Sequence, residues 1–123
     1  MDALKRVSIG KEGYAAITKG TTAKTVLVFC PEPYNQEERL AVRVFPIGVG
    51  IVEDPATGSG NGCLAAYLVH HNYLGSPSID IMVGQGYEVG RPSRLYLKAH
   101  KEGDSIKVSV GGKVVEIAEG EWR

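Results

Sequence analysis

The stretch Glu53-Asp54-Pro55-Ala56-Thr57-Gly58-Ser59-Gly60-Asn61-Gly62 decides the fold of this chain. It is followed by the apolar run CLAAYLV at 63–69. A helix that has no polar stripe is a buried helix. Within the stretch, Asp54, Thr57 and Ser59 are residue types that favour the N-cap, and proline suits the turn before a helix or its first position. The sequence therefore predicts a central buried helix that starts at a glycine-rich turn and is surrounded by strands.

The start of this helix suits a small anion. The first N–H groups of a helix have no intrahelical acceptor, and the helix dipole adds partial positive charge there. Gly58, Gly60 and Gly62 leave room for a ligand, and the hydroxyls of Thr57 and Ser59 add donors. A carboxylate or a phosphate fits such a site. The alternative is an ordinary capped helix after a tight turn. The glycine spacing matches neither the dinucleotide fingerprint nor the P-loop.

Length and charge indicate one domain without a nucleic-acid or membrane partner. The chain has 123 residues, and its 14 basic residues balance 14 acidic ones. It therefore has no net field that would attract nucleic acid or an anionic membrane. Neither a signal peptide nor an apolar run long enough for a bilayer is present. Cys30 and Cys63 lie in apolar segments, so we expect both thiols to pack in the core of a cytoplasmic protein.

The remaining chain predicts an α+β fold with a mainly antiparallel sheet. Residues 2–16 read as one short surface helix. Alternating or β-branched patterns predict about six strands, near 25–30, 40–47, 79–83, 94–100, 106–110 and 113–117. Gly84-Gln85-Gly86 is expected to interrupt the third of these strands as a bulge or bend. Gly111-Gly112 is expected to be the two-residue loop of a hairpin.

Several blocks of this sequence occur in a known family. Glu53-Asp54-Pro55-Ala56-Thr57-Gly58-Ser59, preceded by Arg43-Val44-Phe45 and followed by Asn61–Leu68, resembles the PhzF (phenazine-biosynthesis-like) isomerase family. Two further blocks stand in the order that the family has, Phe29-Cys30-Pro31-Glu32 and Gln85-Gly86 with Gly90-Arg91-Pro92-Ser93. The resemblance covers most of the chain, and the combination is more specific than any single block.

The resemblance implies a diaminopimelate-epimerase-like fold, in which two similar domains each curl a sheet around a central helix. The family's site lies between the domains, where the helix starts bind a substrate carboxylate. Carried over to this sequence, the family's catalytic aspartate is Asp54, and the substrate-binding residues are Thr57, Gly58, Ser59 and Gly60. The family's activity is isomerisation of a dihydro-hydroxyanthranilate by a proton shift, without a metal or an organic cofactor.

The chain also departs from the family, because residues 1–123 resemble only the C-terminal domain. The first domain, which carries the family's general acid/base glutamate, has no counterpart here, and neither have the first strands of the second domain. Gly60 stands where alanine is more usual. We therefore expect a homodimer, or a separate chain that supplies the missing half. The first hypothesis is an isomerase domain for a small carboxylate that is incomplete alone. The alternative is a non-catalytic remnant that binds anions or has a structural role.

Other chemistries are disfavoured by the residue types present. Racemases of the same fold carry cysteine where Thr57 stands, and a threonine hydroxyl cannot replace a thiol in proton transfer at carbon near neutral pH. The three histidines, His70, His71 and His100, have no partners at ligand spacing, so no metal site is predicted. Glu53 is expected to be a solvated neighbour of Asp54.

Overall fold

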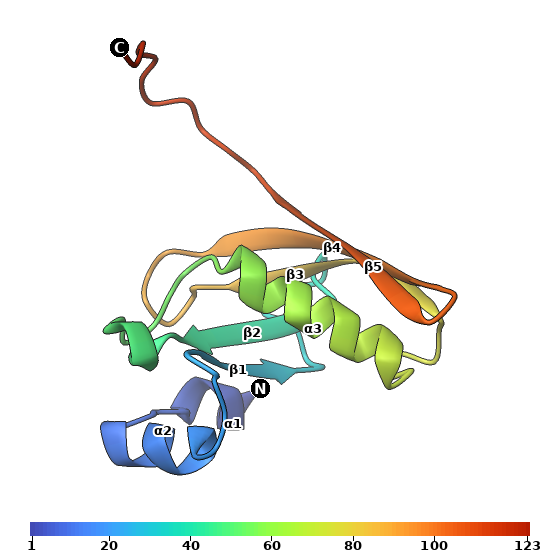
Figure 1. The fold of residues 1–123 in the computed structure, drawn as a ribbon, viewed down its shortest axis with the longest axis horizontal. Helices are drawn as coiled ribbons and strands as arrows, with labels where there is room; N and C mark the ends of the chain where they lie inside the picture. The colour runs from blue at the N-terminus through green and yellow to red at the C-terminus, as the bar shows by residue number, and fades with distance from the viewer.

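A computed structural model describes residues 1–123 as a five-stranded sheet with one long helix across a face and two short helices beside one edge (Figure 1). The elements are α1 (Asp2–Arg6), α2 (Lys11–Thr18), β1 (Val26–Cys30), β2 (Leu40–Phe45), the 3-10 turn η1 (Ile47–Val49), α3 (Gly58–His70), β3 (Ser78–Gln85), β4 (Ser93–Glu102) and β5 (Ser105–Gly112). The strand order follows the sequence, and only the β2–β3 pair is parallel. The predicted α+β class with a mainly antiparallel sheet is confirmed.

The core lies between α3 and one face of the sheet. Alternate residues of β3 and β4 point to the helix, among them Val83 and Leu97, while their neighbours point away. The helix contributes Leu64, Leu68 and other apolar side chains to this core. Each fully buried aliphatic side chain stabilises the fold by about 1.5–3 kcal/mol, whereas an interior helical glycine costs about 1 kcal/mol relative to alanine. Packing therefore outweighs the poor helix propensity of the glycine-rich first turn.

One side of α3 is not covered, which corrects the prediction of a helix buried all round. The helix packs against β3, β4 and β5, and Cys63 and Tyr67 on the opposite side are exposed. The expectation that Cys63 packs in the core is therefore wrong. Phe29 of β1 approaches Tyr67 edge-on, with ring centroids 6.1 Å apart, across a shallow apolar groove. The residues of the helix are apolar on this side too, so composition alone could not tell the two sides apart.

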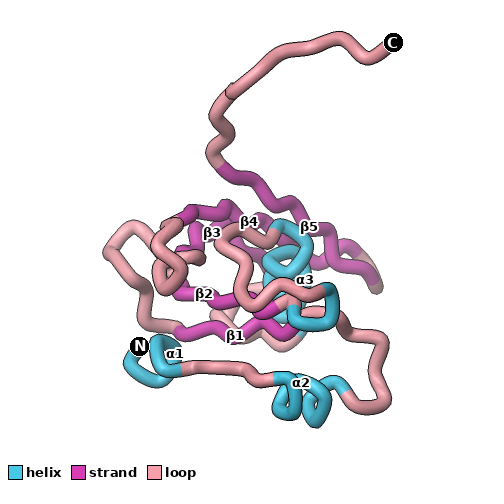
Figure 2. Tube along the Cα trace, turned by 90° about the vertical axis from the view of Figure 1, so that its left-hand side faces the viewer, coloured by secondary structure: helices cyan, strands magenta, loops and turns pink.

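Two turn predictions fail because strand pairing overrides the local glycine signals. Gly84 and Gln85 continue β3 and pair with β4, so the strand is not interrupted there. Gly111 and Gly112 pair with Tyr96 and Leu95, so they are not a hairpin loop. The β4–β5 turn lies at residues 103–104 instead, where Gly103 has φ of 59°. The residues after β5, which include the predicted strand 113–117, are exposed and project away from the sheet (Figures 1 and 2).

The N-terminal segment is attached to the sheet by Arg43. The predicted helix over 2–16 is instead two short helices, α1 and α2, joined by a non-helical stretch. Arg43 donates from Nη1 to the carbonyl oxygens of Leu4 and Val7, both at 2.9 Å. Its Nε and Nη2 donate to the two carboxylate oxygens of Glu53 at 2.9 and 2.7 Å. This bidentate bond raises the pKa of Arg43.

Glu53 is therefore not the solvated residue that the sequence suggested. Its side chain and that of Arg43 are each 7% exposed. Arg43 lies on β2 and Glu53 lies just before the α3 start, so the pair fixes the loop between them. A buried charge that loses its partner is strongly destabilising.

None of the helices is long and apolar enough to cross a bilayer.

Replacing Arg43 should lower the free energy of unfolding by about 3–5 kcal/mol, because Arg43→Met leaves the Glu53 carboxylate buried and unpaired. The measurement is urea unfolding followed by circular dichroism. Lys98→Met is the matched control, since Lys98 pairs with Asp80 at 2.9 Å on the exposed face of the sheet. We expect the control to lose less than about 1 kcal/mol. Equal losses in the two variants would contradict the assigned role of the buried pair.

A tyrosine beside the ion pair is held in its neutral form. The Tyr34 hydroxyl donates to Glu88 at 2.8 Å, and its ring stacks on Tyr87 with centroids 4.0 Å apart. Burial and then the bond to Glu88 raise the pKa of Tyr34 above its ordinary value. The folded state thus holds this proton more tightly than the unfolded state. The resulting stability is complete below the unfolded pKa of about 10 and is lost as the pH rises toward the folded pKa.

Tyr34→Phe should therefore remove part of the alkaline loss of stability. Unfolding free energies measured between about pH 8 and pH 11 should fall less steeply in the variant than in the wild type. Absorbance at about 295 nm should show that the transition at highest pH has disappeared. Tyr96→Phe, on the exposed side of β4, is the control. An unchanged pH dependence in Tyr34→Phe would show that this hydroxyl does not contribute.

Candidate functional site

The loop before α3 is attached to the sheet on both sides. On one side, the Asp54 N–H donates to the Val44 carbonyl of β2 at 2.9 Å, as an isolated antiparallel bridge. On the other side, Gly86 follows β3 directly, has φ of 83° and lies against the backbone of Pro55. A Cβ on Gly86 would meet the Pro55 carbonyl oxygen at 2.8 Å and the Arg91 carbonyl oxygen even closer. These two contacts with the sheet therefore fix the position of the loop.

Gln85 connects this loop with the first turn of the helix. Its side chain is fully buried. The amide nitrogen donates to the Asp54 carbonyl at 2.5 Å and to the Thr57 hydroxyl at 3.0 Å. The amide oxygen accepts from the Thr57 N–H at 3.3 Å and from the Asn61 side chain at 2.8 Å. Sequence reasoning did not identify this residue, because the glycines on either side of Gln85 predicted a bulge or bend there. The sequence feature that could have indicated its role is a polar residue at the end of an apolar strand.

Thr57 is the N-cap residue of α3, yet its side chain does not cap the helix. Its φ and ψ of −101° and 97° are those of an N-cap residue, but no side-chain cap bond is formed. The hydroxyl donates instead to the Asp54 carboxylate. The first-turn N–H groups of Gly58, Ser59 and Gly60 have no intrahelical acceptor. The hydroxyl bond of an ordinary capped helix, the alternative considered above, is therefore not formed.

The predicted site residues lie together around this helix start. One oxygen of the Asp54 carboxylate accepts from Thr57, and the other has no partner in the chain. Gly58 and Ser59 are exposed, while Gly60 is half-buried against Leu27. The Thr57 hydroxyl already donates to Asp54, so it is not a free donor for a ligand. The arrangement offers three backbone donors beside one carboxylate, and the functional role of these residues stays a prediction.

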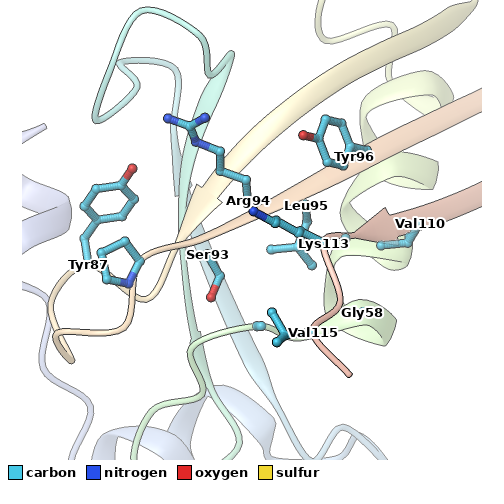
Figure 3. Close-up of a pocket in the computed structure, with 13 residues that line it drawn as sticks. Gly58, Tyr87, Ser93, Arg94, Leu95, Tyr96, Val110, Lys113 and Val115 are labelled. Carbon is cyan, nitrogen blue, oxygen red and sulfur yellow. The ribbon is translucent and has the colours of Figure 1, made fainter. Parts of the chain in front are cut away.

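A cavity of about 700 Å³ opens beside the helix start (Figure 3). Gly58 and Val115 lie on one side of it, and Tyr87, Ser93 and Arg94 lie on the other. The cavity is large enough for a small organic ligand. Its charged lining residues are the cations Arg94 and Lys113, and Arg94 is paired with Glu37 at 2.6 Å. Apart from Gly58, these lining residues could not be linked to a site from the sequence, because they come from the loop after β3, from β4, and from β5 and the residues after it, and they meet only in the folded chain.

No three histidine, cysteine, aspartate or glutamate side chains gather closely enough to hold a metal ion. Of the carboxylates near the helix start, Glu53 is occupied by Arg43, and Asp54 is held by Thr57. The groups of the helix start could bind an anion beside the Asp54 carboxylate, which keeps one oxygen without a partner.

The comparisons with known proteins agree with one another. A family model described as phenazine biosynthesis-like protein (PhzC-PhzF) matches residues 4–120. An uncharacterised isomerase of Mesorhizobium japonicum is 34% identical over 94 residues, which are 76% of this chain and 31% of that protein. The trans-2,3-dihydro-3-hydroxyanthranilate isomerase of Pseudomonas aeruginosa is 42% identical over 80 residues, 63% of this chain and 28% of that enzyme.

A solved structure shows the same fold. The crystal structure of the Bacillus anthracis phenazine biosynthesis protein of the PhzF family matches with a TM-score of 0.77 and 22% identity. The match covers 90% of this chain and 38% of that one. The chain therefore spans roughly a third of the length of the proteins that it matches. The predicted resemblance to the family is confirmed, and this chain shares the α+β fold of the matched part of that structure.

Gly86→Ala should destabilise the protein by more than about 1 kcal/mol, since a side chain there strains the positive φ and pushes the Pro55 loop away. Gly62→Ala is the matched control. Its Cβ would make only ordinary contacts with Val110 and Val108, at 3.6 and 3.9 Å. Because alanine is the better helix former, the control should gain about 0.5–1 kcal/mol. Thermal unfolding measures both, and a Gly86→Ala variant as stable as the wild type would refute the close approach.

Proposed function

Because the chain belongs to the phenazine biosynthesis-like protein family, we propose that it is an isomerase domain that binds a small carboxylate at the start of α3. The reaction would be a proton shift that uses no cofactor, with Asp54 as the group that holds or moves the proton. Named relatives support this proposal, since one is a trans-2,3-dihydro-3-hydroxyanthranilate isomerase. The substrate class is taken from that name and from the anion chemistry of the helix start.

The observation that carries the proposal is the helix start without a side-chain cap. An N-cap threonine usually satisfies one of the free donors of the first turn. Here the Thr57 hydroxyl is bonded to Asp54, so the N–H groups of Gly58, Ser59 and Gly60 are left for another acceptor. A bound carboxylate would accept from these groups and gain from the helix dipole. The exposure of Gly58 and Ser59 gives it access.

The position of Asp54 suits proton transfer next to the bound carboxylate. Its second carboxylate oxygen is free of partners in the chain, and Thr57 fixes the orientation of the group. A carboxylate held in this way can accept a proton from a carbon near the bound group or return one to it. The cavity beside Gly58 offers room for the rest of the substrate, and Tyr87 and Leu95 give it aromatic and apolar walls.

A complete reaction needs a second acid/base group, and we propose that another chain supplies it. Asp54 is the one available carboxylate at the helix start, since Glu53 is bonded to Arg43, and no aspartate or glutamate lines the neighbouring cavity. The matched enzymes extend well beyond the aligned part, which is 28% of the Pseudomonas aeruginosa enzyme. The partner would be a second copy in a homodimer, or a separate protein that carries the remaining part. The exposed apolar side of α3 supports such an association.

The same lack of a second carboxylate favours one alternative function. The chain would then bind a small anion, or join an assembly, without catalysing a reaction. In either case the two free thiols fit a reducing compartment, and we propose the cytoplasm as the location.

Anthranilate should shift the backbone amide signals of residues 57–60 in two-dimensional NMR spectra at millimolar concentration, because these amides are the proposed donors. Anthranilamide, which lacks the charge, is the matched ligand control and should leave the signals in place. Asp54→Asn should keep the binding, since the carboxylate is assigned to proton transfer. If other amides move while those of residues 57–60 do not, the site is wrong.

Deuterium exchange separates the enzyme from the binding module. The test uses trans-2,3-dihydro-3-hydroxyanthranilate in D₂O, with the wild type and with Asp54→Asn. If the chain catalyses a proton shift, the wild type should introduce deuterium at carbon and the variant should not. Binding without exchange at any protein concentration would favour the anion-binding module.

A further inference from the structure

We propose that Gln85 is the positioning residue of the anion site, because its buried amide prevents Thr57 from capping α3. The inference rests on the proposed function, since it explains how the donors of the helix start stay free for a ligand. Gln85 lies at the end of β3 and is fully buried, whereas the donors at Gly58 and Ser59 are exposed. It would not touch the bound anion and acts through Thr57 and Asp54.

The direction of each hydrogen bond around Gln85 is fixed. Its amide oxygen accepts from the Thr57 N–H and from the Asn61 side chain, which are both donors. The amide nitrogen must therefore face the Asp54 carbonyl and the Thr57 hydroxyl oxygen. A reversed amide would place its oxygen against the Asp54 carbonyl and its nitrogen against two donors. Gln85 thus has a single orientation that satisfies its neighbours.

This orientation decides where the Thr57 hydroxyl points. Because the hydroxyl oxygen accepts from Gln85, its hydrogen is left to donate elsewhere, and it donates to the Asp54 carboxylate. A capping bond would require the same oxygen to accept from the N–H of Ser59 or Gly60. The bonds to Gln85 and Asp54 hold this oxygen on the side of the sheet, away from the first-turn N–H groups, and no capping bond is formed. One buried amide therefore keeps the first turn open and holds the Asp54 carboxylate in place.

The network is maintained although it leaves one acceptor unsatisfied. The side-chain oxygen of Asn61 is buried and has no partner, because its nitrogen is committed to Gln85 and to the Thr57 carbonyl. Buried polar groups without partners are rare in folded proteins and need a specific explanation. An apolar residue at position 85 would fill the same space and would release Thr57 to cap the helix. The polar arrangement is the one that serves an anion site.

The test compares Gln85→Met with the double variant Gln85→Met/Thr57→Val. In Gln85→Met the Thr57 hydroxyl is released, so the Gly60 amide should become protected from hydrogen exchange and anthranilate binding should weaken about tenfold. In the double variant no hydroxyl is left, so the Gly60 amide should exchange quickly again and the affinity should recover. Gln36→Met, at an exposed position, is the control and should change neither measurement.

A conservative variant keeps the test decisive if Gln85→Met does not fold. Gln85→Glu retains the acceptor for Thr57 and Asn61, and its introduced carboxyl can donate to Thr57 only when it is protonated. Anthranilate binding in Gln85→Glu should therefore recover as the pH falls through the titration of that carboxyl, which a purely structural role would not produce. Folded variants with unchanged Gly60 exchange and unchanged affinity would overturn the proposal. If the wild type does not bind anthranilate, the proposed function fails, while the Gly60 exchange still tests the role of Gln85.

Discussion

The structure of the candidate site depends on the hydrogen bonds of one buried side-chain amide, that of Gln85. An unpaired polar group in a protein interior costs about 1–3 kcal/mol, so the side chain of Gln85 has to be bonded on all sides. Its partners come from the loop before α3 and from the first turn of the helix. These bonds join the strand, the loop and the helix at one buried point. The same requirement turns Thr57 toward Asp54 and leaves the helix start open.

A second buried polar contact supports this arrangement from the other edge of the loop. The charges of Arg43 and Glu53 lose hydration when they are buried, and a bidentate bond recovers only part of that cost. Backbone carbonyls in α1 and directly after it, those of Leu4 and Val7, accept from the Nη1 of Arg43, so that few of its donors are left without partners. Such a buried ion pair contributes more to the relative orientation of the segments that it joins than to the free energy of folding. It attaches the N-terminal segment and the α3 loop to the same strand.

Several features of the fold followed from the sequence because they are local or periodic. Alternating residues placed four strands within a few positions of their bounds, and the apolar run after Gly62 indicated α3. The quoted blocks around Glu53–Gly62 identified the family, and the anion chemistry of the helix start followed from backbone groups that every helix has. The glycines at 111 and 112 misled the hairpin prediction, since the same pair is compatible with a loop and with a strand.

The tertiary structure decided which partners these groups have. Pairing with β4 kept Gly84 and Gln85 in a strand, and it brought Gln85 under a loop that lies 28 residues earlier in the sequence at Thr57. The burial of Glu53 and the exposure of Cys63 likewise depend on which side of β2 and α3 is covered. By itself the sequence determined the elements, the family and the open donors of a helix start. Only the folded chain decided that Thr57 does not cap them, because that outcome depends on a hydrogen bond between segments far apart in the chain.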